Sequence, residues 1–181
     1  MRLASFLCLF IPFLTTAQVR YTGSNMTRPE NYREWVWLSS GFGMAYGPGT
    51  QAENPDPPFD NVFVNPEAYR GFLKTGMWPD KTVMVLEVRS SQQKGSINQR
   101  GHFQGDGVRV EVHVKDTQRF PEKKWAFFGF GESARSAPPA AADTSCFTCH
   151  EKSGAVDTTF VQFYPILRDV AKQKGTLKPV D

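Results

Sequence analysis

Cysteine is scarce in this chain, which has three in 181 residues. Two of them, Cys146 and Cys149, are three positions apart, and the third, Cys8, lies in an apolar run near the N-terminus. A structural zinc site needs four ligands, usually from a second Cys or His pair, and the sequence has no second Cys-x-x-Cys. The cysteine count therefore argues against a zinc fold.

Clusters of one charge and long apolar runs are missing as well. Lys and Arg number 21 against 18 Asp and Glu without a basic run, so nothing points to nucleic acid. The apolar run from Leu3 to Leu14 is too short to span a bilayer. With Arg2 before it and the small residues Thr15-Thr16-Ala17 after it, the run has the layout of a secretory signal peptide.

We therefore expect residues 1–17 to be a signal peptide and residues 18–181 to form a single domain. The mature protein is predicted to be periplasmic or secreted, with no retained membrane span. Removal of the signal peptide also removes Cys8, so the mature chain keeps only the two cysteines of one motif and has none left for a structural disulfide.

That motif is Cys146-Phe147-Thr148-Cys149-His150. Cys-x-x-Cys-His is the attachment sequence of a c-type haem, in which each thiol forms a thioether to the porphyrin and the histidine is the proximal iron ligand. A thioredoxin-like pair would lie near the start of a βαβ unit, whereas this motif follows a long β-patterned stretch. The sequence predicts one covalent haem c, attached through Cys146 and Cys149 and ligated by His150.

The first half of the chain is predicted to be mixed. Apolar spacing favours a helix over 27–38, and the Gly, Pro and Asn content favours a long loop over 39–58. A short strand is expected over 61–64. Pro66 then begins a helix that runs to about Lys74 and is closed by Gly76.

The middle of the chain is predicted to be β-structure. Strands are expected over 82–89, over 108–114, where Val alternates with polar residues, and over 124–130. The stretches 92–107 and 116–123 are assigned as loops. Consecutive strands with short connections predict an antiparallel sheet.

The last part of the chain is predicted to contain a linker and a helix. Residues 136–142 are assigned as the linker that leads into the haem motif. Asp157 is expected to cap a C-terminal helix that Pro165 would kink and Gly175 would end. The predicted fold class is α+β, mainly β, with an antiparallel sheet cradling one c-type haem and a few flanking helices.

The position of the motif separates classes of cytochrome. A small electron-transfer cytochrome has its motif near the N-terminus and a methionine ligand downstream, but no methionine follows His150. Four-helix cytochromes c′ have a late motif in a helical chain, which the β-patterned residues 82–130 contradict.

A late motif behind an antiparallel sheet resembles the cytochrome P-460 family, which includes the β-sheet cytochromes c′. The resemblance covers most of the mature chain and is most specific at its end. It is carried by Trp78 to Thr82, Lys94 to Asn98, Trp125 to Phe130, Cys146 to His150 and Asp157 to Pro165.

The resemblance implies a five-coordinate iron, with His150 as the proximal ligand and a vacant coordination position on the opposite side, inside an enclosed pocket. It also implies that the protein is often a homodimer. Members with an apolar distal pocket bind nitric oxide, and members with a lysine–haem cross-link oxidise hydroxylamine. The strand after Trp78 carries no lysine, so binding or scavenging of nitric oxide is the leading hypothesis. Hydroxylamine oxidation, with Lys94 or Lys115 as the cross-link, is the enzyme alternative. An electron-transfer cytochrome with an unidentified redox partner is the third.

Several further residues are candidates for the haem surroundings. Phe59 and Phe63 are predicted to cap the distal side. His102 and His113 could reach the iron, but His113 falls on the polar side of its strand, which favours the surface. The strand residues Glu87 and Glu111 could relay protons, and surface exposure is the simpler interpretation for both. The expected ligand is a small gaseous or nitrogen-oxide molecule.

Overall fold

The computed structural model describes residues 19–46 and 56–179. The predicted signal peptide, 1–17, and Cys8 within it lie outside the described residues, as do residues 47–55 of the predicted loop. Within the described residues, no helix combines the length and the apolar character needed to cross a membrane.

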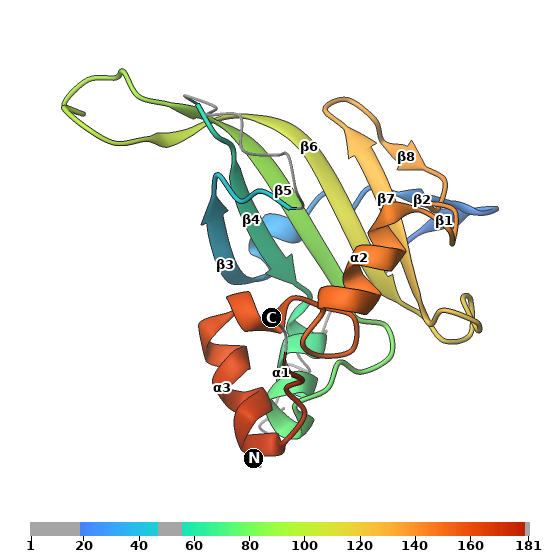
Figure 1. Cartoon of the computed structure of the whole chain (residues 1–181). Coiled ribbons are helices and arrows are strands. Elements are labelled where there is room, and N and C mark those ends of the chain that lie inside the picture. The colour runs from blue at the N-terminus through green and yellow to red at the C-terminus, as the bar shows by residue number, and fades with distance from the viewer. Residues whose placement is uncertain (1–18, 47–55, 180–181) are drawn as a thin grey trace, which may run out of the picture.

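A five-stranded antiparallel sheet forms the centre of the molecule (Figure 1). Its strands follow one another in chain order, each paired with the next, which is the arrangement that short connections predict. The long β5–β6 hairpin projects beyond the rest of the sheet. The strands are β3 (Val36–Phe42), β4 (Phe59–Val64), β5 (Val83–Gln92), β6 (Phe103–Lys115) and β7 (Trp125–Gly131).

The remaining elements lie against the two faces and one end of this sheet. A small antiparallel sheet has the order β1-β2-β8. Helices α1 and α3 lie side by side at one end of the large sheet, and α2 lies near β6 and β7 (Figure 1). The bounds are β1 (Tyr21–Thr22), β2 (Asn25–Thr27), η1 (Tyr32–Glu34), α1 (Pro66–Thr75), β8 (Ser136–Ala137), α2 (Ser145–Ser153), η2 (Val161–Phe163) and α3 (Pro165–Lys174).

Successive side chains of β5 are buried in two different hydrophobic clusters, one on each face of the sheet. Val83 and Val85 are buried in the cluster shared with the small sheet, whereas Met84 is buried with α1 and α3. Successive side chains in a strand point to opposite faces, so the large sheet is covered on both sides. The mainly-β, antiparallel fold class is confirmed, and so are the strands predicted around 61–64, 82–89, 108–114 and 124–130.

One predicted helix is wrong, and the predicted C-terminal helix begins later than expected. The stretch 27–38 contains the end of β2, a single 3₁₀ turn and the start of β3. Its aromatic and β-branched residues instead pair along the sheet, with Val36 opposite Val64 and Trp37 opposite Phe63. The C-terminal helix does not begin at Asp157 and is not kinked, because Pro165 is its first residue, where proline has no hydrogen bond to lose.

The loop predicted over 116–123 is confirmed between β6 and β7, but the other predicted loops are shorter than expected. Residues 39–42 belong to β3, and the two central strands extend to Gln92 and back from Phe103. The linker 136–142 contains β8. The helix predicted from Pro66 to about Lys74 is confirmed as α1, and Gly76 and Gly175 end α1 and α3 in left-handed conformation.

The face of the sheet opposite α2 buries Glu87, which the sequence placed at the surface. Glu87 is 4% exposed, and the Tyr32 hydroxyl donates to its Oε1 at 2.9 Å. Burial and this hydrogen bond raise the pKa of Tyr32 from 10.0 to about 12. The alternation of β5 could not reveal this, because a carboxylate is buried only where cations and hydroxyls elsewhere in the chain meet it.

The raised pKa of Tyr32 predicts a loss of stability in alkali. Between pH 10 and about 12 the unfolded chain releases the phenol proton while the folded chain keeps it. The free energy of unfolding should therefore be fully retained below pH 10 and fall as the pH rises toward 12. Urea denaturation at several pH values checks this, and Tyr32→Phe should flatten the decline. Part of the decline should remain in the variant, because the pKa of Tyr21 is also raised to about 12. A dependence of the unfolding free energy on pH that the substitution does not change would contradict the assignment to Tyr32.

Candidate functional site

Helix α2 carries the whole Cys-x-x-Cys-His motif. Residues three positions apart share one face of a helix, and both free thiols border the same cavity as His150. Phe147, between the cysteines, is buried and meets Phe127 edge-on, with 4.8 Å between the ring centroids. This packing fixes the rotation of α2 against β7 and keeps the two thiols beside the cavity.

The cavity lies between α2, the large sheet and the segment that follows α2. Its volume is about 430 Å³, within the range of small-molecule and cofactor sites. All five strands of the large sheet contribute to its wall, which is mostly apolar. Among the residues that the structure describes, no lysine borders it. The apolar side chains include Val62, Met84, Leu86, Phe127, Phe160 and Phe163.

His150 is oriented by the backbone. Its Nδ1 lies 2.7 Å from the carbonyl oxygen of Thr158, a contact in which Nδ1–H donates and Nε2 is left as the basic nitrogen. The ring also packs against Phe160 and Phe127, at centroid distances of 4.3 and 4.7 Å. Burial lowers the pKa of His150, which favours the neutral imidazole that can bind a metal.

A tight turn presents the Thr158 carbonyl to His150. Asp157 and Thr158 both have positive φ, 48° and 61°, between Val156 and Thr159, which pair as an antiparallel bridge. This is a conformation that non-glycine residues adopt only when surrounding contacts hold them in it. The contacts that hold it here include the ion pair between Asp157 and Lys115 and the hydrogen bond from Trp125 Nε1 to Asp157 Oδ1 at 3.4 Å.

Lys115 is therefore part of the support for His150 and does not border the cavity. Its Nζ donates to Asp157 Oδ2 and, at 2.8 Å, to the carbonyl oxygen of Trp78. Only 13% of its side chain is exposed. Lys94, the other lysine proposed for a cross-link, is exposed on the β5–β6 hairpin and does not border the cavity either.

His113 lies in the site, and its predicted surface position is wrong. The side chain is 7% exposed, stacks on Phe127 at 4.0 Å and meets the ring of His150 at 4.8 Å. Its Nε2 is buried and has no hydrogen-bond partner in the described part of the chain. Burial, with a smaller effect of His150, lowers the pKa of His113 well below its usual value.

One edge of the cavity is polar. Asp60, Glu111 and Tyr46 border it, and Glu111 remains half exposed, as the sequence predicted, while accepting a hydrogen bond from Arg109 at 2.7 Å. Burial raises the pKa of Asp60, and the charge of Arg109 opposes this. Burial also raises the pKa of Tyr46, with a further contribution from Asp60. The cavity thus has protonatable groups at one side of an apolar wall.

Phe59 and Phe63 do not border the cavity. They alternate with Asp60 and Val62 along β4, so their side chains lie on the other face of the sheet. Phe59 contacts Phe42 at 4.7 Å and Phe63 contacts Tyr32 at 5.6 Å between ring centroids. The physical reason is strand register, which a choice based on aromatic character alone could not include.

His102 also lies away from the cavity, with its ring 4.9 Å from that of Phe42. Residues that the sequence analysis missed include Leu86, Met84, Phe127 and Phe160. The alternation of β5 and β6 contained the signal for some of them, because Leu86 pairs with Glu111 and Met84 pairs with His113 on one face. The polar residues of β6 were assigned to solvent, whereas that face forms the cavity wall.

Comparison with known proteins agrees with this arrangement. A search of the curated proteins finds no match. The family model described as Cytochrome P460 matches residues 29–161, from the segment between β2 and η1 through the haem motif to the first residue of η2. The match covers well over half of the chain. This protein therefore belongs to the cytochrome P460 family of haem proteins.

Proposed function

We propose that this protein is an exported cytochrome with one haem c, attached through Cys146 and Cys149, and that it binds nitric oxide. His150 would be the proximal ligand. The observation that carries the proposal is the cavity beside the motif, whose wall is mostly apolar and which no lysine of the described residues borders.

The residues at the cavity fit a haem. Two free thiols lie three positions apart on one helix beside the cavity, which is the donor set that thioether attachment requires. The Thr158 carbonyl holds the proton of His150 on Nδ1 and leaves Nε2 available for iron. The aliphatic and aromatic side chains around them suit a porphyrin face.

When bound, the haem supplies an iron with a coordination position for a small molecule. The chain determines what can use that position. His150 is held by Thr158, and the apolar side chains of Val62, Met84 and Leu86 line the cavity. Asp60 and Glu111 are the groups that can hold or release a proton at its edge. An apolar wall favours a small neutral ligand such as nitric oxide over an ion.

Hydroxylamine oxidation is less well supported because it requires a lysine joined to the porphyrin. Lys115 is engaged by Asp157 and Trp78, and Lys94 is exposed at a distance from the site. An electron-transfer role is supported by one observation, which is that the thioether side chains of Met44 and Met84 border the cavity. If either sulfur bound the iron, the iron would be six-coordinate. The coordination state of the ferrous protein therefore separates electron transfer from the binding of nitric oxide.

We expect the haem-loaded protein to keep its haem on denaturation and to show an intact mass raised by one haem. The ferrous spectrum should be five-coordinate and high-spin, and it should change on addition of nitric oxide. The variant Cys146→Ser/Cys149→Ser should lose its haem to extraction under denaturing conditions.

Three results would contradict the proposal in different ways. A six-coordinate low-spin ferrous spectrum that becomes high-spin in Met84→Ala or Met44→Ala would establish electron transfer. A long-wavelength ferrous band and a haem that stays abnormal after denaturation would establish a lysine cross-link and hydroxylamine oxidation. Extraction of the haem from the unmodified protein would overturn covalent attachment.

A further inference from the structure

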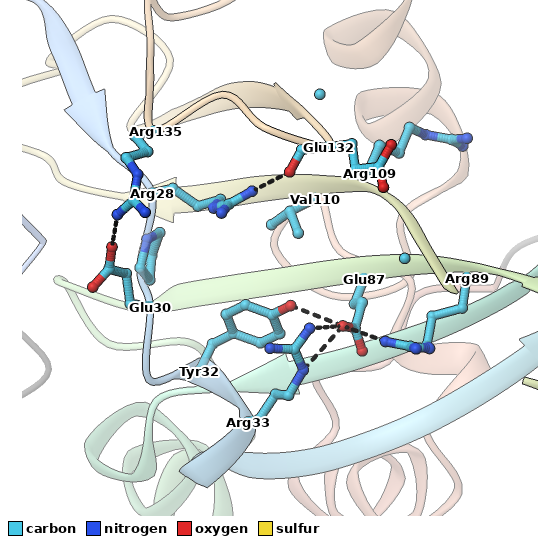
Figure 2. Close-up of a pocket in the computed structure, with 13 residues that line it drawn as sticks. Arg28, Glu30, Tyr32, Arg33, Glu87, Arg89, Arg109, Val110, Glu132 and Arg135 are labelled. Carbon is cyan, nitrogen blue, oxygen red and sulfur yellow. Dashed lines mark hydrogen bonds and ion pairs between the residues drawn. The ribbon is translucent and has the colours of Figure 1, made fainter. Parts of the chain in front are cut away.

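A second cavity lies on the face of the large sheet opposite α2, and it is rich in arginine. Its volume is about 480 Å³, and it lies between η1, the end of β2, and strands β5, β6 and β7. Five arginines and three glutamates border it. The guanidinium of Arg109 is paired with Glu111, which borders the cavity beside α2, so the other four arginines and the three glutamates give a local net charge of +1. Figure 2 shows Arg28, Arg33, Arg89 and Arg135 around the space, whereas the side chain of Arg109 is directed away from it. The five arginines are Arg28, Arg33, Arg89, Arg109 and Arg135.

Two of these arginines are fixed by a buried carboxylate. Glu87 Oε1 accepts from the guanidinium groups of Arg33 and Arg89, as well as from Tyr32 (Figure 2). Arg89 is also held by the carbonyl oxygen of Gly105, at 2.9 Å from Nε. One buried negative charge thus binds two positive charges, which leaves an excess of one positive charge. It also fixes the positions of the two guanidinium groups.

Arg28 adds a charge that forms no ion pair with a carboxylate within the described part of the chain. Its Nη1 donates to the backbone carbonyl oxygen of Glu132 at 3.0 Å, and a carbonyl carries no net charge. Arg28 also acts electrostatically on Tyr32, so its charge reaches the side of the cavity where Glu87 lies. A guanidinium has five donor hydrogens, and most of those of Arg28 remain available.

The remaining two arginines are each paired with a glutamate. Arg135 is highly exposed and pairs with Glu30 at 2.9 Å, and Arg109 pairs with Glu111 at 2.7 Å. Glu111 borders the cavity beside α2, and residues two positions apart on a strand share a face, so this pair lies on the α2 side of the sheet. The interior of the arginine-rich cavity is therefore more positive than its rim.

We propose that this cavity binds a small oxyanion with two or more negative charges, of the phosphate or polycarboxylate type. Arginine recognises both groups through paired hydrogen bonds, and three of the guanidinium groups have donors to offer. The site is concave and small, which favours a small ligand over the surface of a macromolecule. Arg28 and Arg33 are the principal binding residues.

This site is separate from the haem cavity, although one strand reaches both. Leu86 of β5 borders the cavity beside α2, and the next residue, Glu87, borders the arginine-rich cavity. Binding of an anion can consequently be measured without reference to the reaction at the haem. Failure of the proposed nitric oxide function would leave this proposal intact.

The test is titration calorimetry of the haem-loaded protein with inorganic phosphate and, separately, with citrate at low ionic strength. We expect saturable binding of at least one anion, weakened at least tenfold in Arg28→Gln. Arg28→Lys should bind more weakly than the unmodified protein, because lysine keeps the positive charge but lacks the planar guanidinium that donates two parallel hydrogen bonds. Arg168→Gln, on the exposed side of α3, is the matched control and should bind as the unmodified protein does.

A variant that is expected to bind the anion more tightly shows whether a loss of binding in Arg28→Gln could come from misfolding. Glu30→Gln removes the partner of Arg135 and raises the local charge, so it should bind several-fold more tightly, which a damaged fold would not produce. The anion that binds more tightly identifies the ligand type. The proposal is overturned if neither anion binds saturably, if Arg28→Gln binds normally, if Glu30→Gln gains nothing, or if Arg168→Gln weakens binding equally.

Discussion

Gly154→Ala is expected to destabilise the protein by roughly 2–3 kcal/mol, the upper part of the range for overpacking a filled site. A Cβ at Gly154 would lie 2.6 Å from the carbonyl oxygen of His150 and 2.7 and 2.8 Å from two backbone atoms of Thr158. No side-chain rotation can relieve contacts with backbone atoms. The end of α2 and the turn at Thr158 would have to move apart, although the φ of −75° at Gly154 suits any residue.

The same movement should affect His150. Its Nδ1 bond to Thr158 depends on the close approach that Gly154 allows, so the variant should also hold the proximal histidine less firmly. Chemical denaturation measures the stability loss, and the ferrous spectrum reports the change at the iron. Gly129→Ala is the control, because a Cβ there meets nothing within 4 Å and the cost should be small. Equal stability of the two variants would refute the packing argument.

The sequence predicted most of the sheet because its strands carry their own signals. The alternating valines of β6 and the Pro66 to Gly76 helix have local patterns that agree with the final fold. The stretch 27–38 failed because its apolar spacing fits a helix, while the pairing of Val36 and Trp37 with β4 depends on residues more than 20 positions away. Edge strands are decided by partners and are poorly encoded by local propensity.

The motif of the candidate site could be found from the sequence, but its surroundings could not. Cys146, Cys149 and His150 form a contiguous signature, so no knowledge of the fold is needed to locate them. His113 and Glu87 were both assigned to the surface because polar residues on an alternating strand normally face water. An alternating pattern separates two faces of a sheet without revealing what covers each face. Only the placement of α2 and of η1 shows that neither face is open at these positions.

Lys115→Met is expected to lower the free energy of unfolding by roughly 2–3 kcal/mol. Methionine replaces the unbranched apolar part of the lysine side chain with one of equal atom count and leaves Asp157 without its cation. Breaking a fully buried ion pair costs roughly 3–5 kcal/mol, and the loss should be smaller here because the two side chains are 13% and 17% exposed. Adding Asp157→Asn should recover part of the loss, since the remaining charge is then removed. Lys94→Met, on the exposed hairpin, should change nothing.

The haem spectrum of Lys115→Met distinguishes the two roles of this lysine. If Lys115 holds the turn that presents Thr158 to His150, the variant loses stability while its absorption bands keep an ordinary c-haem character before and after denaturation. If Lys115 were joined to the porphyrin, substitution would convert an abnormal spectrum to an ordinary one and would change the mass of the haem-bearing peptide. The contacts of Nζ with Asp157 and with the Trp78 carbonyl favour the first result, because an amine that forms both cannot also reach into the cavity. Stability and spectrum measured together on one variant thereby separate a gas-binding cytochrome from a hydroxylamine oxidase.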